Sequence, residues 1–295
     1  MTQQWKGNTG GTLLGQKAML LLFKYLDVRL GYAIVALVAP LYMLFHNKAC
    51  RAIFRYFRKQ WLYSPAKALA QTYLNHFLFG QMILDRFALF SGRAEMFRTE
   101  ISGNEHFLRL VNSPQGFIIA GSHIGNFEIA GYLLRQNRKT LHALVFPGET
   151  PTVQRNRSRI LEQNNISLIP VANDMSHLIA MRAALAAGNI VIMPADRMYG
   201  STRSATAPFL RGIARFPVGA PTLAILANVE ILAVYVVKQA ARAYSVNVIP
   251  IAQSASADAD KQQRIEACTK AFARSMEETL RKYPAQWFNY YDFWN

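Results

Sequence analysis

The sequence predicts one α/β domain, with a central and largely parallel or mixed sheet flanked by helices, after an N-terminal helical part. Three observations lead to this fold class. From Gly116 onward, short apolar runs alternate with segments of helix length. These runs are apolar throughout, which is typical of strands that helices cover on both faces. The first third of the chain instead holds its apolar residues at helical spacing.

The N-terminal part begins with an apolar segment. Leu30 to Phe45 carries no charge and is bounded by Arg29 and Lys48. A bilayer-spanning helix needs about 20 apolar residues, and Pro40 is expected to kink or stop a helix here. We therefore expect an amphipathic or re-entrant membrane anchor rather than a true span. Residues 1–60 form this membrane-associating segment in our prediction, and residues 61–295 form the remaining domain.

Two further helices are predicted before the sheet begins. Residues 51–60 alternate basic and aromatic side chains, and residues 67–90 have helical spacing, with Pro65 in the first turn and Ser64 as the cap. A basic cluster follows the apolar segment: Lys48, Arg51, Arg55, Arg58 and Lys59. By the positive-inside rule, this cluster keeps the rest of the chain on the cytoplasmic side of a membrane.

The predicted strands and helices then alternate to the C-terminus. The strands cover Gly116–Gly121, Leu141–Phe146, Ile166–Val171, Asn189–Ala195, Ile231–Val237 and Tyr244–Pro250. Between and after them, helices are expected near Phe127–Gln136, Thr152–Gln163, Met175–Ala187, Val218–Ala227 and Asp258–Lys282. Strands that alternate with helices indicate a buried parallel sheet.

Composition narrows the class of partner. The chain has 295 residues and a formal net charge of +16, with 52% hydrophobic and 17% charged residues. Such a basic balance indicates an acidic partner. The basic residues lie beside long apolar runs, which favours anionic lipid, and no nucleic-acid-binding motif is present. Cys50 and Cys268 are far apart and lack metal-ligand spacing, so we expect reduced thiols.

The candidate chemistry lies at the end of the first strand, in the sequence GSHIGNFE. Ligands in open α/β sheets bind at the carboxyl ends of the strands, and His123 follows such an end in a glycine-flanked loop. Glu128 lies five residues later, which is not the same face of a continuous helix, so the glycines must bend the chain if the two side chains meet. A lone histidine at a strand end more often serves a cap or a turn.

Residues 121–131, GSHIGNFEIAG, resemble the H-x4-E/D motif of the lysophospholipid acyltransferase superfamily, and specifically the bacterial lipid A lauroyl/myristoyl acyltransferase family. Two later blocks resemble further segments of that family in the same order. They are residues 194–200 (PADRMYG) and 208–219 (PFLRGIARFPVG). The resemblance runs from about Leu20 to the C-terminus, and three ordered blocks are far more specific than one motif.

The resemblance implies an acyltransferase that moves a fatty-acyl chain directly from a thioester to a hydroxyl or amine of a membrane lipid, without an acyl-enzyme. His123 would be the general base and Glu128 would orient its imidazole. Gly125 and Asn126 would donate to the developing oxyanion. The expected substrate-binding residues are Gly125, Asn126, Asp196, Arg197, Arg211 and Gly212.

The resemblance also implies the partners. Acyl carrier protein is the expected donor, with acyl-coenzyme A as the alternative co-substrate. No bound cofactor and no metal are expected. Other partners are anionic membrane lipids and a lipid acceptor, with no nucleic acid. The enzyme would sit at the bacterial inner membrane with residues 61–295, the catalytic domain, on the cytoplasmic side.

The departures from the family pattern leave the acceptor open. Arg197 stands where the family has glutamine, and the segment 145–151 lacks the family's arginine, for which Arg155, Arg157 or Arg159 would substitute. A lipid A precursor is the default acceptor. An amino-acid lipid, a lysophospholipid or an aryl polyene lipid are alternatives, as is a non-catalytic membrane-binding protein on the same fold. A metal hydrolase is disfavoured because H-E-x-x-H is absent.

Several of these residues also have a purely structural interpretation. Asp196 and Arg197 could form a structural ion pair at a strand end. Arg211 and Arg215 could lie in a solvated basic loop. The C-terminal aromatic run, residues 286–294, is either packed core, which general burial preferences favour, or an interfacial belt at the membrane surface.

Overall fold

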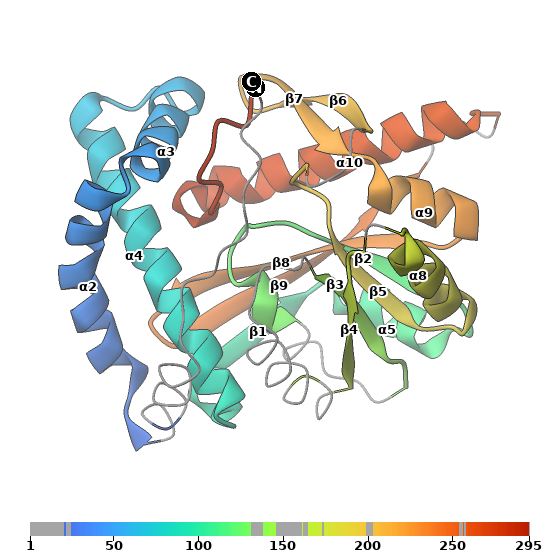
Figure 1. Ribbon diagram of the computed structural model, residues 1–295, viewed down its shortest axis with the longest axis horizontal. Coiled ribbons are helices and arrows are strands. Elements are labelled where there is room, and N and C mark those ends of the chain that lie inside the picture. The colour runs from blue at the N-terminus through green and yellow to red at the C-terminus, as the bar shows by residue number, and fades with distance from the viewer. Residues whose placement is uncertain are drawn as a thin grey trace.

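The computed structural model contains a seven-stranded mixed sheet with the strand order β1-β9-β8-β2-β5-β3-β4. It describes residues 21, 25–130, 138–145, 161, 165–172, 174–198, 203–253, 256 and 258–294, apart from the side chains of Asn47 and Glu128. Helices flank this sheet, and further helices stand beside it (Figure 1). The predicted α/β fold class is therefore confirmed.

All neighbouring strands of the sheet run parallel except β8 and β9. The strands are β1 (Arg98–Ser102), β2 (Phe117–Gly121), β3 (Leu141–Val145), β4 (Ile166–Pro170), β5 (Ile190–Pro194), β8 (Ile231–Ala240) and β9 (Ala243–Ile251). The six predicted strands correspond to β2, β3, β4, β5, β8 and β9. Their apolar runs are continuous because side chains on both faces are buried.

Each face of the sheet packs into its own hydrophobic core. Along β2, Ile118 and Ala120 belong to the core on one face, whereas Phe117 and Ile119 belong to the core on the other. The first face is covered by α8 (Ser176–Ala186), α9 (Gly219–Ala227) and α10 (Lys261–Lys282), and the second by α5 (Asn104–Asn112) and part of α4 (Pro65–Phe90). Together the two cores hold the strand ends of the sheet in fixed register.

A two-stranded antiparallel hairpin, β6 (Ser204–Phe209) with β7 (Gly212–Pro217), lies apart from the main sheet and packs on α10. The sequence did not predict it, and it also did not predict β1 or α5. The hairpin buries only alternate residues, Phe209 and Phe216 among them, so no continuous apolar run marks it. The edge strand β1 is exposed at four of its five residues, so it has no apolar run either.

The N-terminal apolar segment is a single helix, α2 (Val28–Phe45), which begins at an Asp27 cap and continues through Pro40. The expectation that Pro40 stops or kinks the helix was wrong on the stop, because the helix extends five residues past it. Within the described part of the chain, α2 is the one helix long and apolar enough to cross a membrane, judged by length and composition. Most of its surface is exposed, and it packs on α4 through Val28, Tyr32 and Ala39.

The next helix, α3 (Asn47–Gln60), places its basic and apolar side chains on opposite faces. Arg51, Arg55, Arg58 and Lys59 are exposed, whereas Ala52, Ile53, Tyr56 and Phe57 are buried. Both α2 and α3 pack against α4, as the left side of Figure 1 shows. The division of the chain at residue 60 stays a prediction.

The C-terminal aromatic run packs into the core, as the burial preference predicted. After the short helix η3 (Pro284–Gln286), Trp287, Phe288 and Phe293 are at most 7% exposed. The Trp287 ring packs edge-on against Phe209 and Phe293, with ring centroids 5.5 and 4.9 Å away. The segment therefore joins the hairpin to the sheet.

Candidate active site

Two adjacent parallel strands end side by side and carry the candidate site. Gly121 at the end of β2 is paired in register with Pro194 at the end of β5. The ladder continues one step further, because the Ala195 N–H donates to the Gly121 carbonyl oxygen at 2.8 Å. His123 and Asp196 each lie two residues beyond the paired ends, so the sheet register itself brings the two side chains together.

The Asp196 carboxylate contacts His123 twice. The imidazole Nδ1 lies 2.8 Å from Asp196 Oδ1, and the His123 backbone N–H donates to Oδ2 at 2.8 Å. Trp287 Nε1 also donates to Oδ2, at 3.3 Å. The Asp196 side chain is 1% exposed and that of His123 is 18% exposed, so the carboxylate is sealed while the imidazole reaches the surface. This arrangement holds an oriented and partly exposed imidazole against a buried carboxylate.

The ionisation of Asp196 follows from its contacts. Burial raises the pKa of this carboxyl, but the charge and hydrogen bonds of His123 outweigh burial and hold the pKa below its usual range. An ionised carboxylate only accepts hydrogen bonds, so Nδ1 carries the proton and Nε2 is the basic nitrogen when the ring is neutral. Because the folded pKa is the lower one, this carboxylate stabilises the fold at neutral pH, and the contribution is lost as acid protonates it.

The loop after His123 is fixed by its backbone. Gly125 adopts a left-handed conformation with φ +64° and forms a bridge with Val236 on β8. Its N–H donates to the Gln286 carbonyl oxygen at 2.7 Å, and the Asn126 N–H donates to the Val236 carbonyl oxygen at 2.7 Å. The expectation that these two amides serve the oxyanion is therefore corrected, because both donate to protein carbonyls. Their role is to hold the loop.

The C-terminal segment closes one side of this loop. The Phe288 N–H donates to the His123 carbonyl oxygen at 2.9 Å, and Trp287 is bridged to Ile124. Arg197 Nη2 donates to the Phe288 carbonyl oxygen at 2.5 Å, and its guanidinium lies over the Tyr291 ring at 5.9 Å. The structure thus places Arg197 beside the site. It holds the Phe288 backbone, which in turn is hydrogen-bonded to the His123 backbone. Nothing in the local sequence of residues 286–288 signals this role.

Other predicted site residues lie elsewhere or are not described. Glu128 falls in the short helix η2 (Phe127–Ile129), but its side chain is not among those described, so its contact with His123 stays a prediction. Arg211 lies in the exposed turn of the β6–β7 hairpin, where its N–H donates to Gln60 Oε1 at 3.0 Å, and Gly212 is the first residue of β7. Their part in substrate binding also stays a prediction.

Several predictions fall on residues outside the described ranges. They include the helix expected at 152–163 apart from residue 161, most of the one expected at 127–136, and the three arginines that would replace the family's missing one: Arg155, Arg157 and Arg159. Among the residues that are described, no group of three or more His, Cys, Asp or Glu side chains could hold a metal ion. The described chemistry of the site is thus that of His123 and Asp196.

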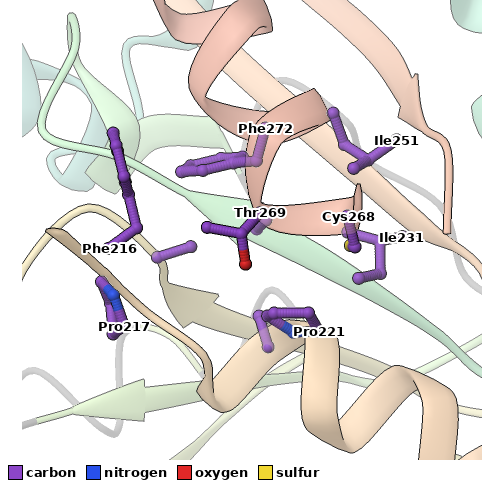
Figure 2. Close-up of a pocket in the computed structure, with 11 residues that line it drawn as sticks. Phe216, Pro217, Pro221, Ile231, Ile251, Cys268, Thr269 and Phe272 are labelled. Carbon is purple, nitrogen blue, oxygen red and sulfur yellow. The ribbon is translucent and has the colours of Figure 1, made fainter. Parts of the chain in front are cut away.

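A small apolar cavity lies beneath the strand ends, between the sheet and the helices α9 and α10 (Figure 2). Ala120 and Ala195 line it, and they precede the loop of His123 and Asp196 respectively. Phe216, Pro221 and Phe272 close it from the hairpin and from the two helices. His123 and Asp196 are not among its lining residues, which are apolar apart from Cys268 and Thr269.

A histidine held by a buried carboxylate at the ends of two parallel strands defines a site for general acid–base chemistry in an α/β fold. The family model described as bacterial lipid A biosynthesis acyltransferase matches residues 66–294. The chain belongs to that family and is an acyltransferase. This confirms the resemblance that the three sequence blocks indicated.

No curated protein sequence matches this chain. Among solved structures, the chain is similar to the 1-acyl-sn-glycerophosphate (LPA) acyltransferase PlsC from Thermotoga maritima, with 14% sequence identity and a TM-score of 0.39. The match covers 92% of this chain and 99% of that one.

Proposed function

We propose that the enzyme transfers a fatty-acyl chain from acyl carrier protein to a hydroxyl or amine of a lipid A precursor, with His123 as the general base. The observation that carries this proposal is the imidazole of His123, oriented by Asp196 and partly exposed, in a chain of the lipid A acyltransferase family. The carboxylate fixes the ring tautomer that leaves Nε2 as the basic nitrogen.

The proposed reaction needs one proton carrier. His123 Nε2 takes the proton of the acceptor hydroxyl while the acceptor oxygen attacks the thioester carbonyl carbon. When the tetrahedral intermediate collapses, the carbon–sulfur bond breaks, and the imidazolium returns the proton to the leaving thiolate. The acyl chain is then esterified to the acceptor. Asp196 stabilises the imidazolium that forms. General-base catalysis of this kind contributes about 10²–10⁴ in rate.

Charge supports an acidic donor. The chain carries a formal net charge of +16, and acyl carrier protein is acidic, so long-range attraction would speed their encounter. Arg211 and Arg215 are exposed on the β6–β7 hairpin, where they are available to such a partner. Acyl-coenzyme A is the alternative donor.

The exposed surfaces of α2 and α3 support membrane association. Large apolar side chains on α2 face outward, with Leu37, Leu44 and Phe45 68–81% exposed. The exposed face of α3 that follows is basic, through Arg51, Arg55, Arg58 and Lys59. An apolar surface beside a basic one suits an anionic bilayer, where the two contributions add. We propose that α2 anchors the enzyme at the inner membrane with the catalytic domain on the cytoplasmic side.

The test is a transfer assay with the purified full-length protein in vesicles that contain a bacterial lipid extract with lipid A precursors. Acyl carrier protein and coenzyme A, each loaded with the same labelled fatty-acyl chain, are compared as donors at equal concentration. We expect label in a lipid A precursor, a higher kcat/KM with the carrier protein, and a fall in that kcat/KM as salt screens the attraction. Label in no lipid from either donor would contradict the proposed function, and preference for coenzyme A would contradict the donor.

A further inference from the structure

A buried cluster of polar side chains connects α4, β8, β9 and α2 on the sheet face opposite α10. Its centre is an ion pair between Lys238 on β8 and Asp85 on α4, whose side chains are 3% and 0% exposed. Lys238 Nζ also donates to the Tyr32 hydroxyl at 2.9 Å and to the Ala241 carbonyl oxygen at 3.0 Å. The hydroxyls of Tyr32 and Tyr244 both donate to the Asp85 carboxylate. Every charge in the cluster is therefore compensated.

The cluster reaches the catalytic loop by two routes. The Asn126 amide Nδ2 donates to the Tyr244 hydroxyl at 3.3 Å and to the Met82 carbonyl oxygen at 3.1 Å, one turn before Asp85 on α4. Along the backbone, the Lys238 N–H donates to Gln286 Oε1 and the Lys238 carbonyl oxygen accepts from Gln286 Nε2, both at 2.8 Å. Because the Gln286 carbonyl oxygen in turn accepts the Gly125 N–H, both ends of Lys238 lead to the His123 loop.

The cluster also reaches the anchor helix. Tyr32 is one of three buried residues of α2, and it is the one whose side chain carries a polar group into the domain. Its hydroxyl lies between Asp85 on α4 and the Ala241 carbonyl oxygen at the turn from β8 to β9. The other side of α2 is apolar and exposed, with Leu37 76% exposed. Helix α2 thus exposes apolar side chains on one side and contacts the buried cluster through Tyr32 on the other.

A buried ion pair is weak support for stability, because desolvation offsets most of the attraction between the charges. Burial lowers the pKa of Lys238 and raises that of Asp85, while each charge opposes the shift of the other. Apolar residues of similar size would fill this space at little cost to folding. What apolar side chains would not supply is directed hydrogen bonds that fix Asn126 relative to α2 and α4.

We propose that Tyr32, Asp85, Lys238 and Tyr244 are positioning residues of the acyl-transfer site, which fix the His123 loop relative to the membrane-anchoring helix α2. This inference rests on the proposed function. It makes the active geometry of the loop depend on α2 being seated on α4. None of the four residues touches the reacting atoms in this account, and all act through Asn126 and Gly125.

The first test compares two conservative variants that each remove one buried hydroxyl from neighbouring strands. Tyr244→Phe removes the hydroxyl between Asp85 and Asn126. Tyr235→Phe is the matched control, because the Tyr235 hydroxyl is buried on the opposite face of the sheet and bonds to Ser275 Oγ at 2.7 Å. We expect similar falls in Tm for both, but a fall in kcat of about tenfold for Tyr244→Phe alone, with KM for the donor unchanged. Equal kcat values in the two variants would overturn the proposal.

A second test asks whether the anchor helix and the loop are coupled through the cluster. Tyr32→Phe and Tyr244→Phe are measured singly and together. If both hydroxyls act through Asp85, the double variant Tyr32→Phe/Tyr244→Phe loses no more kcat than the worse single variant. Fold-losses in kcat that multiply in the double variant would show that Tyr32 acts independently and would overturn the coupling.

Failure of this inference is distinguishable from failure of the proposed function. The transfer assay with wild-type protein comes first, and a wild type that labels no lipid contradicts the proposed function. A wild type that transfers acyl groups, with Tyr244→Phe and Tyr235→Phe equal in kcat, contradicts only the positioning role. Asp85→Asn is avoided because it leaves Lys238 charged and buried without its partner, which is expected to unfold the chain.

Discussion

Replacing Asp196 with asparagine should lower kcat about 10²–10⁴-fold while the protein stays folded. Three donors converge on the Asp196 carboxylate: the His123 N–H, His123 Nδ1 and Trp287 Nε1. An asparagine side chain offers one acceptor oxygen, and its NH₂ group must face one of these donors. If the NH₂ group faces Nδ1, Nδ1 must accept a hydrogen bond, and the ring proton moves to Nε2. Nε2 is then unable to take the proton of the acceptor hydroxyl.

The measurement is steady-state kinetics of Asp196→Asn with both substrates saturating, accompanied by a thermal unfolding curve. Glu230→Gln is a suitable control, because it removes a carboxylate that pairs with Arg109 at 2.7 Å on the surface, away from the described site contacts. Glu128→Gln completes the set. A large loss in Glu128→Gln with normal turnover in Asp196→Asn would contradict the role given to Asp196 and support the role that the family resemblance implies for Glu128.

A second large effect is expected for Gly125→Ala. A Cβ at this position would lie 1.9 Å from the Val236 carbonyl oxygen, and the residue has φ +64°. The left-handed conformation alone costs about 1 kcal/mol for a residue with a side chain, but a contact this short forces the loop away from β8. Displacing a catalytic loop by about 1 Å can cost roughly 10² in rate, so we expect kcat to fall by that order.

Two other glycines provide controls that distinguish backbone strain and steric clash from loss of catalysis in Gly125→Ala. Gly92 has φ +90° with no heavy atom within 4 Å of an added Cβ, so Gly92→Ala tests the cost of the backbone conformation alone. At Gly103, φ is +70° and an added Cβ lies 2.1 Å from the Val248 carbonyl oxygen, which reproduces the clash at a site remote from His123. Gly103→Ala should lower Tm about as much as Gly125→Ala but keep kcat. Normal kcat in Gly125→Ala would show that the loop position is not critical.

The sequence predicted the strands that build the site better than it predicted their partners. Six buried strands are visible as apolar runs, and the histidine at the end of β2 follows from that pattern. The pairing of His123 with Asp196 spans 73 residues and depends on β2 and β5 being neighbours in the sheet. Local periodicity carries no information on strand order, so Asp196 was assigned to substrate or to an ion pair rather than to the imidazole.

The bracing of the loop was also invisible in the sequence. Gln286, Trp287 and Phe288 contact the His123 loop from the far end of the chain, and their aromatic character predicted burial but not location. The two loop amides looked like oxyanion donors because glycine-flanked turns often expose their N–H groups. In the folded chain, these N–H groups donate instead to the carbonyl oxygens of Gln286 and of Val236 on β8. Tertiary contacts therefore decided the roles that sequence proximity had suggested.

The turnover of His123→Ala measures whether the His123 imidazole is the general base. The imidazole is 18% exposed, and the buried Asp196 carboxylate keeps two other donors without it, the His123 N–H and Trp287 Nε1, so its removal should lower Tm but leave a folded protein. We expect a folded protein whose kcat for acyl transfer is lower by a factor of about 10²–10⁴. Turnover by folded His123→Ala at the wild-type rate would contradict this role, since the acceptor's proton would then be removed without the His123 imidazole.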